Sequence, residues 1–283
     1  MENLPDHIHL RNGSSSLWIS RSLDAQSALR LFTEPDALFS HPQCKLIKDQ
    51  RKIKVGRIPL EMGGTLGRIY LKRYNAFSWR YRFVSLFASS AALRSWVGAG
   101  ILMGADFRTG KPVGAVECRS WGMLTKSFYI AEEIPSGSTV DGHWRDKLRD
   151  LRGAEGFRQR RIFLGALAAL FRSLHEMGIY HNDLKDANIF VCQDEIIREG
   201  SFYLLDLEGI RKFRHLGDRR RVKNLVQLNR TMGRMLSNAK KIYFLKTYLG
   251  RIFSDGKIKR EWIRRIIKVS EREDKRSLRK TLG

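Results

Sequence analysis

The chain is poor in residues that cross-link or interrupt a fold. Its 283 residues include three cysteines and six prolines, and no proline follows Pro135. The cysteines, at positions 44, 118 and 192, are far apart and odd in number. Neither a disulfide framework nor a cysteine-rich zinc site is therefore predicted, and we expect a protein of the reducing cytosol.

Long apolar runs are also lacking. No apolar stretch approaches the roughly 18 residues that a membrane-spanning helix needs. The polar N-terminus, with Glu2 and Asp6, is unlike a secretory signal. Apolar residues still make up 42% of the chain, which is enough to bury a core in one large domain or two small lobes. We therefore expect a globular protein that is soluble or lies peripherally on a membrane.

Acidic residues are scarce as well. The chain has 29 Asp and Glu against 53 Lys and Arg, a formal net charge of +24. Such an excess predicts a polyanionic partner: nucleic acid, an anionic membrane surface or a phosphorylated substrate. No motif of a known RNA- or DNA-binding domain occurs, so nucleic acid is the least favoured of the three. Segment 257–283 alone has 11 Lys or Arg and 4 Asp or Glu, a net of +7.

The order of the predicted elements indicates two lobes. Residues 1–43 are loosely patterned and are expected to be a partly ordered lead-in. Alternating apolar and polar residues predict strands over 44–74, with a turn at Gly63-Gly64, and again over 112–118 and 126–134. Helical patterns occur over 88–100, 146–152, 154–177, 219–237, 239–253 and 258–280. We predict an α+β fold with an N-lobe over 44–134, a mostly helical C-lobe over 135–256 and a basic C-terminal helix or tail over 257–283.

Two stretches of the predicted C-lobe carry most of the chemistry. Residues 181–188 read His-Asn-Asp-Leu-Lys-Asp-Ala-Asn, directly after the predicted long helix and its capping Gly178. Residues 202–209 read Phe-Tyr-Leu-Leu-Asp-Leu-Glu-Gly, an apolar strand that ends in an acid. Each residue alone is more often a turn, a cap or a strand exit. Together, H-x-D-L-K-x-x-N followed by D-x-x-G favours a phosphoryl-transfer site.

Each requirement of phosphoryl transfer has a candidate residue. Asp183 could accept the proton of an attacking hydroxyl, and Lys185 could reach the transferred phosphoryl group. Asn188 and Asp206 offer oxygen atoms to Mg²⁺. Lys72 lies in a predicted strand and points opposite to Leu71, where it could hold the α- and β-phosphates of a nucleotide.

On these residues the chain resembles the protein-kinase-like superfamily, and within it the bacterial lipopolysaccharide kinase family of Kdo and heptose kinases. The similarity covers roughly residues 44–240. The segments that carry it are Ile69–Tyr74, Ser90–Trp96, Tyr180–Phe190, Phe202–Gly209 and Arg219–Asn229.

The resemblance implies a two-lobed kinase fold, with one helix on the N-lobe's antiparallel sheet. It implies ATP- and Mg²⁺-dependent phosphorylation of a sugar hydroxyl in the lipopolysaccharide inner core. By position, Lys72 resembles the phosphate-binding lysine and Asp183 the catalytic base. Asn188 and Asp206 resemble the metal ligands. The partners implied are the lipopolysaccharide core and lipid A in a Gram-negative bacterium.

Two departures from the kinase pattern stand out. The acid that usually pairs with the strand lysine is expected just before Trp96, yet Ser95 occupies that position. The usual D-F-G becomes Asp206-Leu-Glu-Gly, which keeps the metal-binding acid. A regular glycine-rich loop is also missing, since Gly56 and Gly63-Gly64 do not form G-x-G-x-x-G.

The spacing after Asp206 favours a compact, non-peptide acceptor of the phosphoryl group. Only about a dozen residues separate Asp206 from the basic helix near Arg219, and no A-P-E motif closes a peptide-binding platform.

The backbone contacts to adenine can also be predicted. Because Pro135 has no N–H, it cannot donate a hydrogen bond to adenine. We predict that Glu132 supplies a backbone carbonyl and Ile134 a backbone N–H to adenine.

The charge excess predicts where the protein works. We expect peripheral attachment to the anionic cytoplasmic face of the inner membrane through the C-terminal helices. Two alternatives to a lipopolysaccharide kinase stay open at this point. One is a small Ser/Thr protein kinase or another small-molecule kinase. The other is a nucleotide-binding pseudokinase that acts as a scaffold.

Overall fold

The computed structural model describes residues 6–23, 28–29, 32–62, 65–192 and 196–281. They form two compact units. Unit 1 comprises Met1–Pro135 together with Asp206–Ile210, and unit 2 comprises Ser136–Leu205 and Arg211–Gly283. The predicted turn at Gly63-Gly64 lies outside the described residues.

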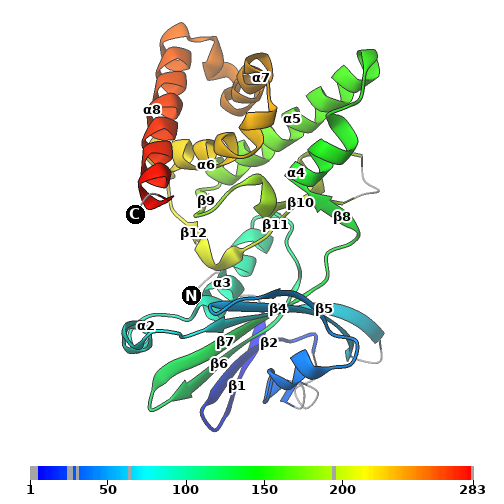
Figure 1. Cartoon of the computed structure of the whole chain (residues 1–283), viewed down its shortest axis with the longest axis vertical. Helices are drawn as coiled ribbons and strands as arrows, with labels where there is room; N and C mark the ends of the chain where they lie inside the picture. The colour runs from blue at the N-terminus through cyan, green and yellow to red at the C-terminus, as the bar shows by residue number, and fades with distance from the viewer. Residues whose placement is uncertain (1–5, 24–27, 30–31, 63–64, 193–195, 282–283) are drawn as a thin grey trace. The chain divides into compact units, whose positions relative to one another are not determined.

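Unit 1 is built on a seven-stranded sheet in which every neighbouring pair is antiparallel (Figure 1). Alternation along the strands buries one set of side chains, and Leu71 and Ile130, which face each other in register, are fully buried. The strands predicted over 44–74, 112–118 and 126–134 are present. The spatial order is β1 (His7–Asn12), β2 (Ser15–Ser20), β6 (Pro112–Ser120), β7 (Met123–Glu132), β5 (Thr65–Asn75), β4 (Ile53–Met62) and β3 (Lys45–Asp49).

The N-terminal region contributes more than the partly ordered lead-in expected from the sequence. Its strands β1 and β2 extend the sheet, because β2 pairs with β6 from Ser15 to Ile19. Leu17 and Ile19 of β2 are fully buried in the same core as Phe128. Only two side chains of this six-residue strand are buried, and such a short alternation is hard to recognise in a sequence.

Among the described residues, unit 1 also contains two α-helices, two 3₁₀ turns and the helical residues Ala28, Leu29 and Phe32. The two helices and two turns are η1 (Ala37–Ser40), α2 (Trp79–Val84), α3 (Ala91–Met103) and η5 (Leu207–Gly209). The helix predicted over 88–100 is α3, which starts three residues later because Ser90 caps it: the Ser90 hydroxyl accepts the Leu93 N–H at 3.0 Å. Trp96 anchors α3 in the core with no exposed surface.

Unit 2 is mainly helical. Its helices are α4 (Val140–His143), α5 (Gly153–Glu176), α6 (Asp218–Arg230), α7 (Asn238–Leu249) and α8 (Gly256–Thr281). A π-helical turn, η2 (Trp144–Leu148), and the 3₁₀ turns η3 (Asp186–Asn188), η4 (Glu199–Ser201), η6 (Met232–Met235) and η7 (Gly250–Ser254) lie between them. One small sheet contains β8 (Gly137–Thr139), β10 (Ile189–Cys192) and β11 (Phe202–Leu204), in which β10 pairs antiparallel with both neighbours. A second sheet pairs β9 (Ile179–His181) with β12 (Ile210–Lys212).

The long helix α5 is the spine of unit 2. It buries an apolar stripe that includes Phe163, Leu167 and Phe171. The helix stops where Gly178 takes a φ of +73°, as the predicted cap requires. A β-carbon at Gly178 would lie 2.0 Å from the Phe213 carbonyl oxygen, so only glycine lets the chain pass into β9 here.

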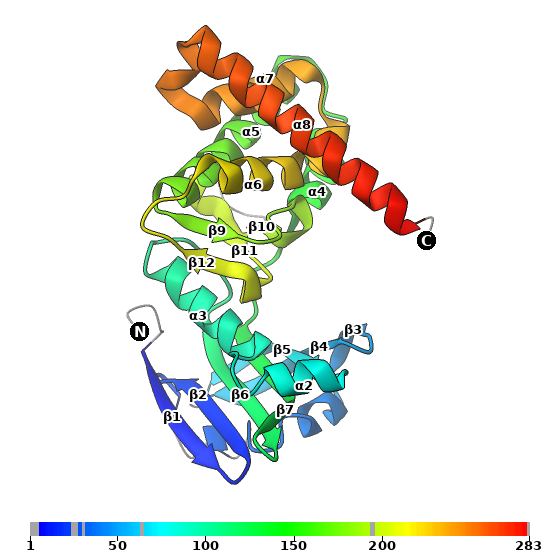
Figure 2. The same ribbon diagram turned by 90° about the vertical axis from the view of Figure 1, so that its left-hand side faces the viewer.

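The C-terminal basic segment is an ordered helix in the described structure. Figure 2 shows α8 as a long helix that packs beside α6. Two ion pairs join these helices: Arg230 to Asp274 at 2.9 Å, and Arg265 to Asp218 at 2.7 Å. None of the helices in the described part of the chain is long and apolar enough to cross a bilayer.

Candidate active site

Lys72 lies on β5 in the middle of the unit 1 sheet, between Val55 of β4 and Tyr129 of β7. Its Nζ is 2.5 Å from Oδ1 of Asp206. Burial disfavours the charged amine, but Tyr74 and the Asp206 carboxylate outweigh burial and raise the pKa of Lys72. Lys72 is therefore a cation at neutral pH, and the two residues predicted to bind phosphate and metal are in direct contact.

Ser95, the residue that replaces the expected acid, is connected to Lys72 through Tyr74. The Ser95 hydroxyl donates to the Ala91 carbonyl at 3.0 Å and so accepts the Tyr74 hydroxyl, also at 3.0 Å. The Lys72 Nζ in turn lies 4.9 Å from the centre of the Tyr74 ring. A neutral serine–tyrosine link thus stands where an acid was expected, and the acid paired with Lys72 is Asp206.

Asp206 itself adopts a left-handed backbone conformation, with φ 57° and ψ 58°, as it leads into η5. This conformation is uncommon for a residue with a side chain and is often found at functional sites. The predicted apolar strand ends at Leu204, before the acid, since the chain turns here. The turn is packed against α3 so closely that a β-carbon at Gly98 would lie 2.4 Å from the Leu207 carbonyl oxygen.

Glu208 is a second acid beside this turn. Its carboxylate lies 3.9 Å from the Arg94 guanidinium of α3. Burial raises the pKa of Glu208, the Asp206 charge raises it further, and the charges of Lys72 and Arg94 offset only part of the effect. The sequence had singled out Asp206 in D-L-E-G and left Glu208 without a role.

The predicted adenine-binding residues lie at the end of β7. The Glu132 N–H donates to the Lys111 carbonyl at 2.8 Å, and the Glu133 N–H donates to the Arg68 carbonyl at 2.8 Å. The Glu133 side chain is held by Arg57 and Arg68, and these hydrogen bonds outweigh its burial and lower the pKa of Glu133. The backbone before Pro135 is thus well fixed, and the register through Glu132 and Ile134 stays a prediction.

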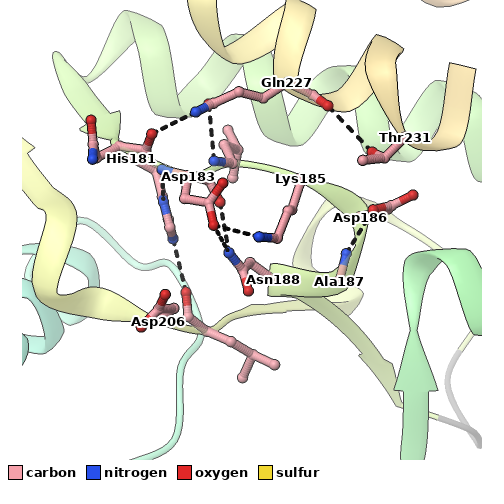
Figure 3. Close-up of polar contacts among 12 residues, drawn as sticks. His181, Asp183, Lys185, Asp186, Ala187, Asn188, Asp206, Gln227 and Thr231 are labelled. Atoms are coloured by element: carbon pink, nitrogen blue, oxygen red, sulfur yellow. Dashed lines mark hydrogen bonds and ion pairs between the residues drawn. The ribbon is translucent and has the colours of Figure 1, made fainter. Parts of the chain in front are cut away.

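In unit 2, the loop between β9 and β10 brings Asp183, Lys185 and Asn188 together (Figure 3). Lys185 Nζ lies 2.6 Å from Oδ2 of Asp183. The Asn188 amide donates to the same Oδ2 at 3.0 Å and to the Asp183 carbonyl at 2.8 Å. The Asp183 carboxylate is therefore oriented by two donors on its Oδ2 atom.

His181 has a structural role in this loop. Its Nε2 lies 2.8 Å from the Leu205 carbonyl, to which it must donate. Its Nδ1 accepts the Asp183 N–H at 3.1 Å. A neutral imidazole protonated on Nε2 satisfies both contacts. His181 thus shapes the Asp183 turn and anchors Leu205, the residue that precedes Asp206 in the chain.

Asn224 and Gln227 of α6 also hold the loop, and sequence reasoning had given them no function. The Asn224 amide donates to the His181 carbonyl at 2.6 Å. Gln227 donates to the Asn182 carbonyl at 2.5 Å and accepts the Leu184 N–H at 3.1 Å (Figure 3). The sequence offered one indication of their role: two amide side chains lie three residues apart on a mostly apolar helix face. Buried amides need hydrogen-bond partners, so such a pair indicates contacts with another segment.

His175 extends this network into the core. Its Nε2 donates to the Asn224 side-chain oxygen at 3.1 Å, since the Asn224 amide nitrogen is already donating to the His181 carbonyl. Its Nδ1 then accepts the Tyr248 hydroxyl at 2.8 Å. Burial lowers the pKa of His175 to about 4, and nearby Arg221 opposes the charged form as well. The imidazole is neutral at physiological pH and stabilises α6 against the loop.

The residues predicted to hold Mg²⁺ have the right donor chemistry. Hard cations such as Mg²⁺ prefer oxygen ligands. Asp206 offers a carboxylate in unit 1. In unit 2, the Asn188 amide nitrogen is directed to Asp183, so its oxygen is the atom that faces away and could accept a cation. No cluster of three or more His, Cys, Asp or Glu side chains suited to a metal occurs among the described residues.

A seven-stranded sheet with a lysine–aspartate pair, together with a helical unit that holds an H-N-D-L-K-x-x-N loop, defines a protein-kinase-like phosphotransferase. The sequence model of the Lipopolysaccharide kinase (Kdo/WaaP) family matches residues 66–248, and the chain belongs to that family. The predicted family, fold class and kinase activity are confirmed. None of the curated proteins compared with the chain matches it.

A solved structure described as "WaaP in complex with acyl carrier protein" resembles the chain with a TM-score of 0.61. The match covers 88% of this chain and 97% of that one, at 19% sequence identity, and shows a shared fold. As a member of its family, the chain is a lipopolysaccharide core kinase with ATP as the phosphate donor.

Proposed function

We propose that the chain transfers the γ-phosphate of ATP to a hydroxyl of a heptose or Kdo sugar in the lipopolysaccharide inner core. The observation that carries this proposal is the orientation of Asp183. Its Oδ2 atom accepts hydrogen bonds from Lys185 and Asn188, which leaves Oδ1 to take the proton of the sugar hydroxyl. General-base assistance of this kind contributes about 10²–10⁴-fold to rate.

Lys185 has a second part in the reaction. Its ammonium group lies beside the proton acceptor, at 2.6 Å from Asp183 Oδ2. A cation at that place stabilises negative charge on the phosphoryl oxygens during transfer. Lys185 thus combines the positioning of Asp183 with stabilisation of the group that is transferred.

The other residues bind the nucleotide. Lys72 holds the α- and β-phosphates, and the backbone of Glu132 and Ile134 holds adenine. Asp206 and Asn188 are the residues that would each offer an oxygen ligand to Mg²⁺, and the bound ion would supply positive charge that neutralises the phosphates. Lys72 is available for this purpose because its Tyr74 and Asp206 contacts keep it protonated.

The short segment after Asp206 favours a sugar over a peptide as acceptor. After η5 and the three residues of β12, helix α6 begins at Asp218. This leaves little chain for the platform on which protein kinases place a peptide. A Ser/Thr protein kinase is accordingly the less favoured alternative.

The acceptor lipid also suggests a location. Lipid A and the inner core are rich in phosphates and carboxylates, and the chain carries a net charge of +24. We propose peripheral attachment to the cytoplasmic face of the inner membrane of a Gram-negative bacterium, in part through the basic helix α8. Salt-insensitive binding to anionic vesicles, or binding unaffected by removal of residues 257–283, would argue against this attachment.

An acyl carrier protein is a second partner supported by a specific feature. A pocket of about 440 Å³ is lined by residues of α6, η6, α7 and α8. Its lining is mostly apolar and includes Leu228, Met232, Phe244, Leu245 and Ile263. Lys241 also lines the pocket and could bind an anionic group. We propose that it takes the acyl chain of an acyl carrier protein. Leu228→Trp should abolish co-purification with acylated carrier protein, and the control Ile252→Ser, at an exposed apolar residue that does not line the pocket, should not.

The transfer reaction itself is tested with purified lipopolysaccharide core oligosaccharide, ATP and Mg²⁺. Wild-type protein should place phosphate on the sugar, and Asp183→Ala should lose about 10²–10⁴-fold in kcat with unchanged ATP binding. Asp150→Ala, at an exposed acid, is the matched control. Phosphate on protein alone would support the protein-kinase alternative. ATP binding without turnover in the wild type would support the pseudokinase.

A further inference from the structure

Unit 1 carries a concentrated patch of exposed apolar side chains that the kinase site does not use. It lies on and after α2 and on the turn between β6 and β7. We call it the aromatic surface, and it consists of Trp79, Phe83, Val84, Leu86, Phe87 and Trp121. Scattered exposed apolar residues are ordinary, but a contiguous exposed patch marks an interaction site.

Trp121 is the most exposed member, with 94% of its surface accessible. It sits at the tip of the β6–β7 hairpin with a φ of 54°, followed by Gly122 with a φ of 75°. A left-handed conformation is a genuine outlier for a bulky residue. Gly, Asn or Asp would be favoured at this turn position, so the requirements of the turn do not account for a tryptophan there.

Hydrogen bonds join the two parts of the aromatic surface, the segment after α2 and the β6–β7 turn. The Ser85 hydroxyl accepts the Leu124 N–H at 2.9 Å. Arg119 donates to the Ser85 carbonyl at 3.2 Å and to the Gly122 carbonyl at 2.9 Å. The segment after α2 and the hairpin tip are therefore one built surface of unit 1.

Exposed aromatic residues recur along α2 and the turn that follows it. Trp79, Phe83 and Phe87 are spaced by four residues, and the Phe83 and Phe87 rings lie 6.4 Å apart in an edge-to-face contact. Trp79 is 68% and Phe87 84% exposed. Side chains at this spacing lie on one side of a helical turn, so Trp79 and Phe83 share one side of α2. Figure 2 shows the ribbon of α2 beside β7.

The charge around the aromatic surface has one sign. No Asp or Glu occurs from Met62 to Ala105, a span with six Lys or Arg, including Arg80 and Arg82 within α2. Glu117 of the adjoining strand β6 is 4% exposed and is paired with Arg119 at 2.9 Å. The exposed apolar groups thus have cationic neighbours, which is complementary to an anionic partner.

We propose that the aromatic surface inserts into the headgroup region of an anionic lipid bilayer. Trp and Phe on one side of a helix, with Arg beside them, are typical of interfacial membrane binding, and Trp favours the boundary between headgroups and acyl chains. The aliphatic Val84 and Leu86 favour a bilayer over a nucleic acid, which would call for more cations. This proposal rests on the proposed function in one respect: a lipopolysaccharide acceptor is embedded in a membrane, which gives the protein a reason to bind one.

The test uses the full chain and vesicles of phosphatidylcholine with about a third phosphatidylglycerol. The double variant Trp121→Ser/Phe87→Ser should bind at least about tenfold more weakly than wild type in a flotation assay. The matched control is Phe157→Ser, an aromatic side chain of unit 2 that is 61% exposed. Vesicles with brominated acyl chains should quench the fluorescence of wild type more than that of Trp121→Phe.

The outcomes separate this proposal from its rivals. Binding within twofold of wild type for the double variant, at an unchanged melting temperature, would overturn it. So would a concentration-dependent dimer or a single-stranded oligonucleotide complex that the double variant loses while vesicle binding persists. Phosphate transfer to delipidated core oligosaccharide should be unchanged in the double variant. If the wild type lacks transfer, the proposed function fails while vesicle binding still tests the aromatic surface.

Discussion

The hydroxyl of Tyr74 on β5 lies 3.0 Å from the hydroxyl of Ser95 on α3, and this contact joins the strand that carries Lys72 to its neighbouring helix. Ser95 cannot form an ion pair with Lys72, whereas an acid at this position could. The link is buried, with Ser95 1% and Tyr74 6% exposed. A neutral hydrogen bond therefore positions Tyr74, and Tyr74 together with Asp206 positions Lys72.

Removal of the Tyr74 hydroxyl should weaken nucleotide binding. A typical hydrogen bond contributes about 1 kcal/mol, so Tyr74→Phe should raise the KM for ATP about fivefold and leave kcat nearly unchanged. Steady-state kinetics with varied ATP measures the effect. Tyr81→Phe on α2 removes a hydroxyl away from Lys72 and should behave as wild type. An equal effect of both variants would disprove the link between Ser95 and ATP binding.

Gly98 allows the close approach of α3 to the turn after Asp206. In Gly98→Ala, the new β-carbon would lie 2.4 Å from the Leu207 carbonyl oxygen, so the turn must shift. Overpacking of this kind costs about 1–3 kcal/mol. We expect lower stability and an ATP affinity at least about fivefold weaker, measured by denaturant unfolding and by nucleotide titration. Gly200→Ala, where no atom lies within 4 Å of the new carbon, is the control.

Asn224 connects α6 to the Asp183 loop. Asn224→Leu keeps the side chain's shape but leaves the His181 carbonyl and the His175 Nε2–H without their partner. Buried groups left unpaired cost about 1–3 kcal/mol each. We expect a stability loss of that size and a fall in kcat larger than any rise in KM for ATP. Asn229→Leu on the same helix loses only a 3.5 Å contact to Ser270 and should keep its kcat.

His175 makes stability depend on pH. Its pKa is about 4 in the folded protein and 6.5 ordinarily, so above pH 6.5 both states are neutral. As the pH falls below 6.5 the unfolded state binds the proton first, and stability decreases until about pH 4. Each pKa unit is worth about 1.4 kcal/mol, which gives a loss of about 3 kcal/mol over this window.

Chemical unfolding between pH 7.5 and 4 measures this dependence. His175→Leu should be less stable at pH 7.5, because Tyr248 and Asn224 lose a partner, and should show a flatter profile. His41→Gln, at an exposed imidazole, should reproduce the wild-type slope. A wild-type slope retained in His175→Leu would assign the pH dependence to other groups.

The contiguous part of the site was predictable from the sequence because its geometry is local. Asp183, Lys185 and Asn188 lie within six residues, and a short loop between two strands necessarily keeps them near one another. The alternation in β5 likewise predicted that Lys72 and Leu71 point to opposite faces. The acid at the end of the strand Phe202–Leu204 was visible as a polar residue after an apolar run.

Contacts between distant segments could not be predicted in this way. Tyr74 and Ser95 are 21 residues apart, and Asn224 and His181 are 43 apart. The strands β1 and β2 were missed because their buried positions are few and become recognisable only beside β6. Nothing in the sequence marks Glu208 as unusual, because the burial that raises its pKa depends on the tertiary structure.

The sequence by itself determined the family, the kinase motifs and the positive charge, since each depends on residue identity and short spacing. Tertiary structure decided which groups complete the site: Tyr74 and Ser95 for Lys72, and Asn224, Gln227 and His175 for the Asp183 loop. It also gathered α2 and the β6–β7 turn into the aromatic surface. The physical reason is that a buried polar group must find a partner wherever packing places one, and packing depends on the whole chain.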